Sequence, residues 1–154
     1  ELMYGDKGNV PEQEYLIPIG KSNVVHEGND VTLVSFGKMM KVAEETFNVA
    51  KKENISVEVI DLRSVRPIDY DSIVKSVKKT NRLVIIEEAW PLASISSEIS
   101  HHIQRFAFDY LDAPVHRITC EDVPFHYAPT LIKEILPSVE KAMKAIKSVT
   151  YKKN

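Results

Sequence analysis

Short apolar runs alternate with amphipathic stretches along most of this sequence, and this alternation constrains the fold more than any other feature. Three runs are predicted to form buried strands: residues 31–36 (VTLVSF), 56–62 (SVEVIDL) and 82–88 (RLVIIEE). The third has a continuous apolar centre, as expected for a strand that helices cover on both faces. A shorter run at 115–119 (VHRIT) is predicted to be the last strand.

The stretches between these strands have the spacing of helices. Apolar residues recur at helical intervals in residues 38–52, and Asp69 is suited to cap a helix that carries Ile73, Val74 and Val77. Residues 92–108 and 137–147 are predicted to form two more helices. Strands that alternate with helices predict an α/β fold with a largely parallel sheet and right-handed crossovers.

The amino-terminal region differs from the rest. Residues 1–20 contain Pro11, Pro18 and three of the five glycines, and they are interpreted as an extended arm or interdomain linker before a domain at 21–154. Residues 24–26 and 31–36 are predicted to form an antiparallel hairpin through the turn at 27–30 (EGND). Because the chain opens on Glu1 rather than Met, we expect a fragment of a longer protein.

Composition restricts the possible partners. Lys and Arg number 20 against 22 Asp and Glu, so no basic field attracts nucleic acid. No apolar run approaches the roughly 20 residues that a membrane-spanning helix needs. The single cysteine, Cys120, suits a reducing compartment and is predicted to be a small buried apolar residue.

The predicted carboxyl ends of the strands are where a parallel sheet binds ligands. No glycine follows Gly37, so the later strands lack the glycines that a phosphate-binding turn requires, and a nucleotide cofactor is not expected. Glu87 and Glu88 could form an acid–base pair, but adjacent strand residues point to opposite faces. We favour one carboxylate capping the next helix and the other in an ion pair.

Metal and nucleophilic sites have no strong signal. His101 and His102 are adjacent and diverge by about 100° on a helix, which does not suit a shared metal ion. No histidine accompanies a nucleophile elbow. The proline-rich arm and residues 111–114 and 123–129 together combine rigid turns with aromatic side chains, a composition that fits either a protein interface or a surface loop. The residues alone therefore predict an α/β domain without a complete active site.

Several motifs, taken together, resemble the carboxy-terminal domain of pyruvate dehydrogenase beta subunits. They are YLIPIGK at 15–21, DLRSVRPID at 61–69, TNRLV at 80–84, EEAWP at 87–91 and LDAPVHRIT at 111–119. The resemblance implies a transketolase C-terminal-like fold: three α/β/α layers and a five-stranded mixed sheet whose first strand is antiparallel. Ala89, Ser94 and Cys120 stand where family members often have glycine, and His126 where proline is common.

The resemblance also implies a function. The parent enzyme, two alpha and two beta chains, uses thiamine diphosphate and magnesium for the oxidative decarboxylation of pyruvate that supplies acetyl-CoA, in bacterial cytoplasm or the mitochondrial matrix. In the family these cofactors lie between the alpha subunit and the amino-terminal domain of the beta subunit. This fragment is therefore expected to bind no cofactor and to be inactive alone.

The family's carboxy-terminal domain contributes beta–beta contacts and a docking surface for the subunit-binding domain of the dihydrolipoyl acyltransferase. Asp112 is the acidic position carried over to that docking role; its alternative role is to cap the turn before Pro114. Two other functions stay open. One is the same domain from a branched-chain 2-oxoacid or acetoin dehydrogenase, and the other is a free-standing small enzyme that uses Glu87, Glu88 and Asp122.

Overall fold

The computed structural model describes residue 5 and residues 7–152. Within this part of the chain, five strands form one sheet in the order β1-β3-β2-β4-β5. The strands are β1 (Asn23–His26), β2 (Val31–Ser35), β3 (Val57–Asp61), β4 (Leu83–Ile86) and β5 (His116–Ile118). All pairings are parallel except that of β1, which runs antiparallel to β3 at one edge. The predicted mixed α/β sheet is confirmed.

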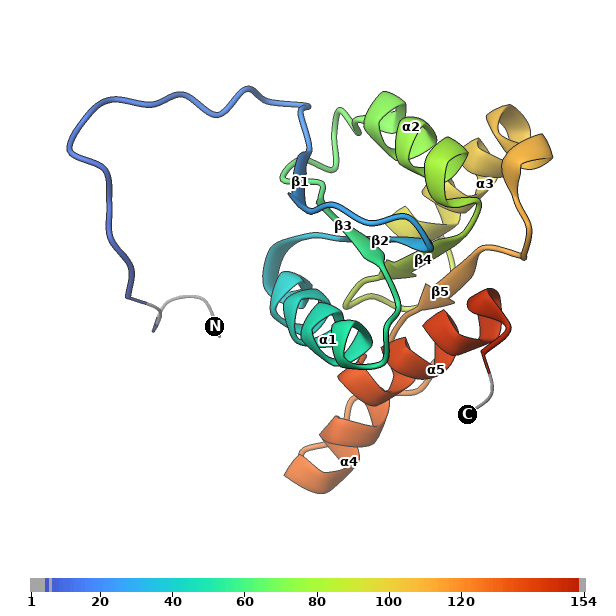
Figure 1. The fold of residues 1–154 in the computed structure, drawn as a ribbon. Helices are drawn as coiled ribbons and strands as arrows, with labels where there is room; N and C mark the ends of the chain where they lie inside the picture. The colour runs from blue at the N-terminus through green and yellow to red at the C-terminus, as the bar shows by residue number, and fades with distance from the viewer. Residues whose placement is uncertain (1–4, 6, 153–154) are drawn as a thin grey trace.

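Helices cover both faces of this sheet (Figure 1). One face packs against α1 (Met40–Lys52) and α5 (Val139–Thr150), and the other against α2 (Tyr70–Thr80) and α3 (Ile95–Phe106). A 3₁₀ helix at Gly37–Met39 leads into α1, and a second at Phe108–Tyr110 follows α3. The short α4 (Pro129–Ile135) projects below this three-layer body.

Strand β2 lies at the centre of the sheet, and all of its residues are buried. Val31 and Leu33 face the α1/α5 layer, and Val34 faces the α2/α3 layer. The polar residues of this strand are hydrogen bonded, which removes the cost of burying them. Thr32 Oγ1 lies 2.6 Å from Ser76 Oγ of α2, and Ser35 Oγ donates to the Ile86 carbonyl at 3.0 Å.

Side-chain caps fix where three helices begin. Asp69 Oδ1 accepts a hydrogen bond from the Ser72 N–H at 3.3 Å, which confirms its predicted role at the start of α2. Ser94 and Ser138 accept equivalent bonds at the starts of α3 and α5. Asn81 ends α2 in the left-handed conformation, which asparagine adopts more readily than most residues.

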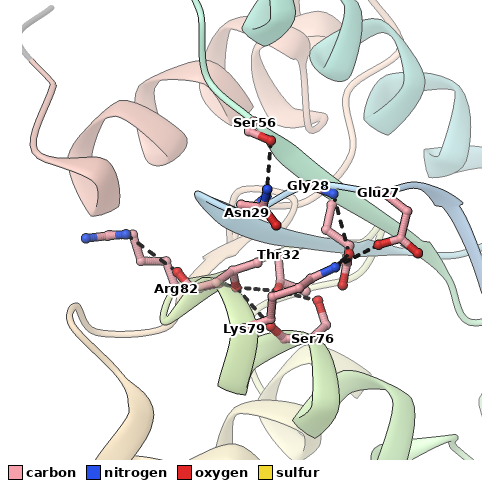
Figure 2. Close-up of polar contacts among 10 residues, drawn as sticks. Glu27, Gly28, Asn29, Thr32, Ser56, Ser76, Lys79 and Arg82 are labelled. Carbon is pink, nitrogen blue, oxygen red and sulfur yellow. Dashed lines mark hydrogen bonds and ion pairs between the residues drawn. The ribbon is translucent and has the colours of Figure 1, made fainter.

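The predicted hairpin of β1 and β2 is wrong, because β1 pairs with β3 instead. The connecting turn is tied to β3 and α2 (Figure 2). Gly28 N–H donates to Glu58 Oε2 at 3.4 Å, and Lys79 Nζ contacts both Glu27 and the buried Glu58. The Asn29 N–H donates to Ser56 Oγ at 3.1 Å. These contacts hold the turn against β3, so that the chain crosses from β1 on one side of β3 to β2 on the other.

Several element boundaries and one helix also differ from the sequence predictions. The last helix begins at Val139 rather than at residue 137, because Ser138 provides the cap. No helix was predicted at Pro129–Ile135, where the structure has α4. This helix is short and Ile135 is its one buried residue, so its sequence carries almost no apolar periodicity.

We expect Gly28→Ala to destabilise the domain. A Cβ at this position would overlap the backbone of Val57 and Glu58, so β3 would have to shift. The expected loss is about 2 kcal/mol or more in the free energy of unfolding, measured by urea denaturation. Gly8→Ala is the matched control, because nothing lies within 4 Å of an added Cβ there. Equal stabilities for the two variants would contradict this packing.

The cap at Asp69 predicts a pH-dependent contribution to stability. Burial opposes ionisation, but hydrogen bonds from Ser22 and Ser72 together outweigh it and lower the pKa of the carboxyl. Its stabilisation is therefore present above the ordinary pKa of about 3.9 and lost as the pH falls through the folded value. We expect Asp69→Ala to cost about 1 kcal/mol at pH 7.

Urea denaturation at pH 7 and pH 3 checks this expectation, and the deficit of Asp69→Ala should shrink at the lower pH. The control is Asp71→Ala, which removes an exposed carboxylate from the first turn of the same helix. A deficit of the same size at both pH values would show that ionised Asp69 is not the stabilising form.

Candidate functional site

Glu87 and Glu88 follow β4 at the carboxyl end of the sheet, where a parallel sheet binds ligands. Glu87 is buried, and its Oε1 accepts a hydrogen bond from the Ser96 N–H at 3.0 Å, in the first turn of α3. Glu88 Oε2 lies 2.6 Å from Lys38 Nζ. One carboxylate thus caps a helix and the other forms an ion pair, as the sequence analysis favoured. This arrangement does not suit an acid–base pair.

Two of the remaining strand-end carboxylates are also engaged structurally. Glu121 Oε1 accepts from Lys141 Nζ at 2.9 Å, and Asp61 Oδ1 accepts from the Arg63 N–H at 3.0 Å. Asp122 is exposed. Cys120 is buried as predicted, and burial together with the charge of Glu88 raises the pKa of its thiol. A thiol with a raised pKa is a poor nucleophile at neutral pH.

A hollow of about 330 Å³ lies at this end of the sheet, and we tested it against thiamine diphosphate. Its lining is Glu88, Ala89, Trp90, Cys120 and Phe125. A diphosphate needs backbone N–H groups or cations at close range, whereas this lining offers a carboxylate and large apolar side chains. The residues that line this hollow do not fit the cofactor.

Metal ligands do not gather either. Residue 5 and residues 7–152 contain no group of three or more His, Cys, Asp or Glu side chains arranged to hold a metal ion. The ring of His102 stacks on Tyr70 with centroids 3.8 Å apart, and burial lowers the pKa of that histidine.

Within residue 5 and residues 7–152, none of the helices has the length and apolarity needed to cross a bilayer.

Large apolar side chains are exposed on the two loops that leave β4 and β5 and on α4. We call this set the apolar end surface; it comprises Trp90, Leu92, Val123, Phe125, Tyr127 and Leu131. Tyr127 is fully exposed, and Trp90 and Phe125 are about half exposed at 55% and 48%. Trp90 and Phe125 line the same hollow. Because exposed aromatic residues are typical of protein interfaces, this end of the sheet suits contact with another polypeptide.

Asp112 lies at the other end of the sheet, where the chain enters β5. Its N–H donates to the Asn81 carbonyl at 2.9 Å, and its carbonyl accepts from the Tyr151 hydroxyl at 2.8 Å. The carboxylate is exposed, and Oδ2 accepts from Arg82 Nη2 at 3.2 Å. The side chain therefore forms an ion pair rather than the turn cap that the sequence left as an alternative.

The tertiary structure separates the residues that the sequence analysis singled out. Since β4 and β5 are parallel, their carboxyl ends hold Glu87, Glu88 and Asp122, whereas Asp112 precedes β5 at the amino end. Sequence reasoning missed Arg82, which reaches Asp112 from a position 30 residues away. No local pattern in the sequence signals that contact.

Comparison with known proteins identifies relatives along nearly the whole chain. The chain is 44% identical to the pyruvate dehydrogenase E1 component subunit beta of Rickettsia felis over 151 residues, covering 98% of this chain and 46% of that protein. The corresponding Rhizobium meliloti subunit is 44% identical, with 99% and 33% covered. The mitochondrial subunit of Dictyostelium discoideum is 45% identical, with 99% and 44% covered. The chain thus spans less than half the length of these relatives.

The solved structures agree on the fold. A split gene transketolase, described as an inactive beta4 tetramer, superposes with a TM-score of 0.79 at 24% identity, covering 90% of this chain and 45% of that one. The family model for the transketolase C-terminal domain matches residues 20–142. The chain therefore belongs to the transketolase C-terminal domain family and matches the pyruvate dehydrogenase E1 beta subunits within it.

Proposed function

We propose that this chain is the carboxy-terminal part of a pyruvate dehydrogenase beta subunit, and that it assembles and docks the enzyme instead of catalysing on its own. The parent would oxidatively decarboxylate pyruvate with thiamine diphosphate and magnesium, in bacterial cytoplasm or the mitochondrial matrix. The single observation that carries the assembly role is the apolar end surface, whose aromatic side chains are half to fully exposed in the described chain. Residues 1–20 would be the interdomain linker and 21–154 the domain.

The position of the apolar end surface supports this role. Burying side chains such as Phe125 and Tyr127 contributes about 1.5–3 kcal/mol each, so an uncovered group of them favours association. The hollow beside them does not fit a cofactor, since Glu88 lines it. We infer that the alpha subunit or the amino-terminal part of the beta subunit, or both, cover this surface in the assembled enzyme.

Complementation tests the assembly role. We expect no pyruvate decarboxylation from the chain alone when thiamine diphosphate, magnesium and an artificial electron acceptor are supplied. Adding the alpha subunit and the amino-terminal part of the beta subunit from Rickettsia felis should restore turnover. The double variant Phe125→Ser/Tyr127→Ser should lower that restored rate by more than about tenfold, because each ~1.4 kcal/mol of lost association energy is a factor of ten.

The control for complementation is Phe106→Ser. Phe106 is 55% exposed, similar to Phe125, but it lies at the end of α3 rather than in the apolar end surface. It should complement like the wild-type chain. Turnover by the unsupplemented chain would overturn the proposed function, and full complementation by the double variant would remove the apolar end surface from it.

Docking is the second part of the proposal. We assign Asp112 as an acidic contact for the subunit-binding domain of the dihydrolipoyl acyltransferase, whose basic residues would approach it. Asp112 suits this role because its side chain is 54% exposed and because it lies away from the apolar end surface. A charge contact of this kind mainly sets specificity and association rate.

We expect Asp112→Asn to weaken binding of the subunit-binding domain about tenfold, that is by ~1.4 kcal/mol, at low salt. Titration calorimetry at 50 mM and 300 mM salt measures it, and the wild-type affinity should fall with salt because the contact is screened. Asp109→Asn removes an exposed carboxylate three residues earlier and should change little. Equal affinities for Asp112→Asn and the wild type would remove Asp112 from the docking surface.

A further inference from the structure

Arg82 contacts the carboxylate assigned to docking, and nothing in the sequence motif signals this. The guanidinium is held by backbone carbonyls from separate parts of the chain. Nε donates to the Val149 carbonyl at 2.9 Å, and Nη1 donates to the Asp30 carbonyl at 3.2 Å. Nη2 donates to Asp112 Oδ2 at 3.2 Å. Figure 2 shows Arg82 extending away from the Lys79 cluster.

These bonds fix a positive charge beside Asp112. The Arg82 side chain is 23% exposed and its rigid fork is matched to the carbonyls around it, so it cannot leave without breaking several hydrogen bonds. Asp112 is more exposed, and in the described chain no hydrogen bond reaches its second oxygen, Oδ1. A basic partner group therefore meets a carboxylate with one oxygen occupied and the other open.

We propose that Arg82 is a specificity-determining residue for docking: an internal counter-ion that weakens the attraction of Asp112 for cations and directs a partner's basic group to Oδ1. This inference rests on the proposed docking function. Arg82 partly neutralises the carboxylate and repels an incoming cation. A cation that cannot reach Oδ1 gains little binding affinity from Asp112. A partner whose basic group reaches Oδ1 gains more, and is therefore selected over other partners.

The test measures binding of the acyltransferase subunit-binding domain to charge variants of the full chain by titration calorimetry. Arg82→Gln removes the counter-ion and should tighten binding roughly threefold at 50 mM salt, as Coulomb's law gives for like charges about 6 Å apart in water. The gain should disappear at 300 mM salt, where the repulsion is screened. Arg82→Lys keeps the charge but not the fork, and its affinity should stay within about twofold of wild type.

The matched control is Lys141→Gln. It removes one positive charge from another exposed ion pair, with Glu121 at 2.9 Å, at the opposite end of the sheet. Its docking affinity should not change, which separates a local effect of Arg82 from a change in net charge. Thermal unfolding checks that each variant is folded, and Arg82→Met, which keeps an aliphatic stem, replaces Arg82→Gln if that variant unfolds.

The outcomes distinguish the two proposals. Tighter, salt-sensitive binding by Arg82→Gln, with weaker binding by Asp112→Asn, supports the counter-ion role. If Asp112→Asn weakens binding while Arg82→Gln binds equally or less tightly than wild type, the inference is overturned and the docking function stands. If Asp112→Asn binds like wild type, the docking assignment itself fails and the inference fails with it.

Discussion

The domain depends on covering both faces of β2. This strand has neighbours on both sides and helices on both faces, so each polar group on it must find a partner inside the protein. Thr32 meets this requirement with two hydroxyls of α2, Ser76 at 2.6 Å and Thr80 at 2.7 Å. The same bonds place α2 over the strand. Burial and hydrogen bonding here specify one position for the helix, where apolar packing alone would allow several.

A sheet covered on both faces leaves its ends for contact with other molecules. In this chain the two ends differ in chemistry. The carboxyl end of β4 and β5 carries exposed aromatic side chains such as Trp90 and Tyr127, and the amino end carries the charged Asp112. Partners at opposite ends do not compete for space. The two ends of one domain therefore offer separate surfaces, one suited to apolar contact and the other to charge.

Charged side chains in this domain are positioned by counter-ions from distant segments. Lys79 pairs with the buried Glu58 and with Glu27, and in doing so it fixes the turn that follows β1. Arg82 applies the same arrangement to the exposed Asp112. In the first case the pair stabilises the fold, and in the second it adjusts how strongly a surface carboxylate attracts a cation. The difference follows from the exposure of the carboxylates, because Glu58 is buried whereas the Asp112 side chain is 54% exposed and its pair is screened by water.

The sequence by itself determined the elements and much of their chemistry. Short apolar runs predicted the strands, and helical spacing of apolar residues predicted four helices. The position of Asp69 predicted a helix cap, and the adjacency of Glu87 and Glu88 predicted their separate structural roles. These signals are local, since each lies within one element or its boundary. Only the tertiary structure decided that β1 lies beside β3, because a short turn such as residues 27–30 is compatible with a hairpin and with a crossing. The close approach of Gly28 to Val57 accompanies this arrangement, and the ion pair of Arg82 with Asp112 is a second feature that the tertiary structure decided; each joins residues about 30 positions apart. Spacing along the chain does not encode such contacts; they arise when packed elements bring distant residues together.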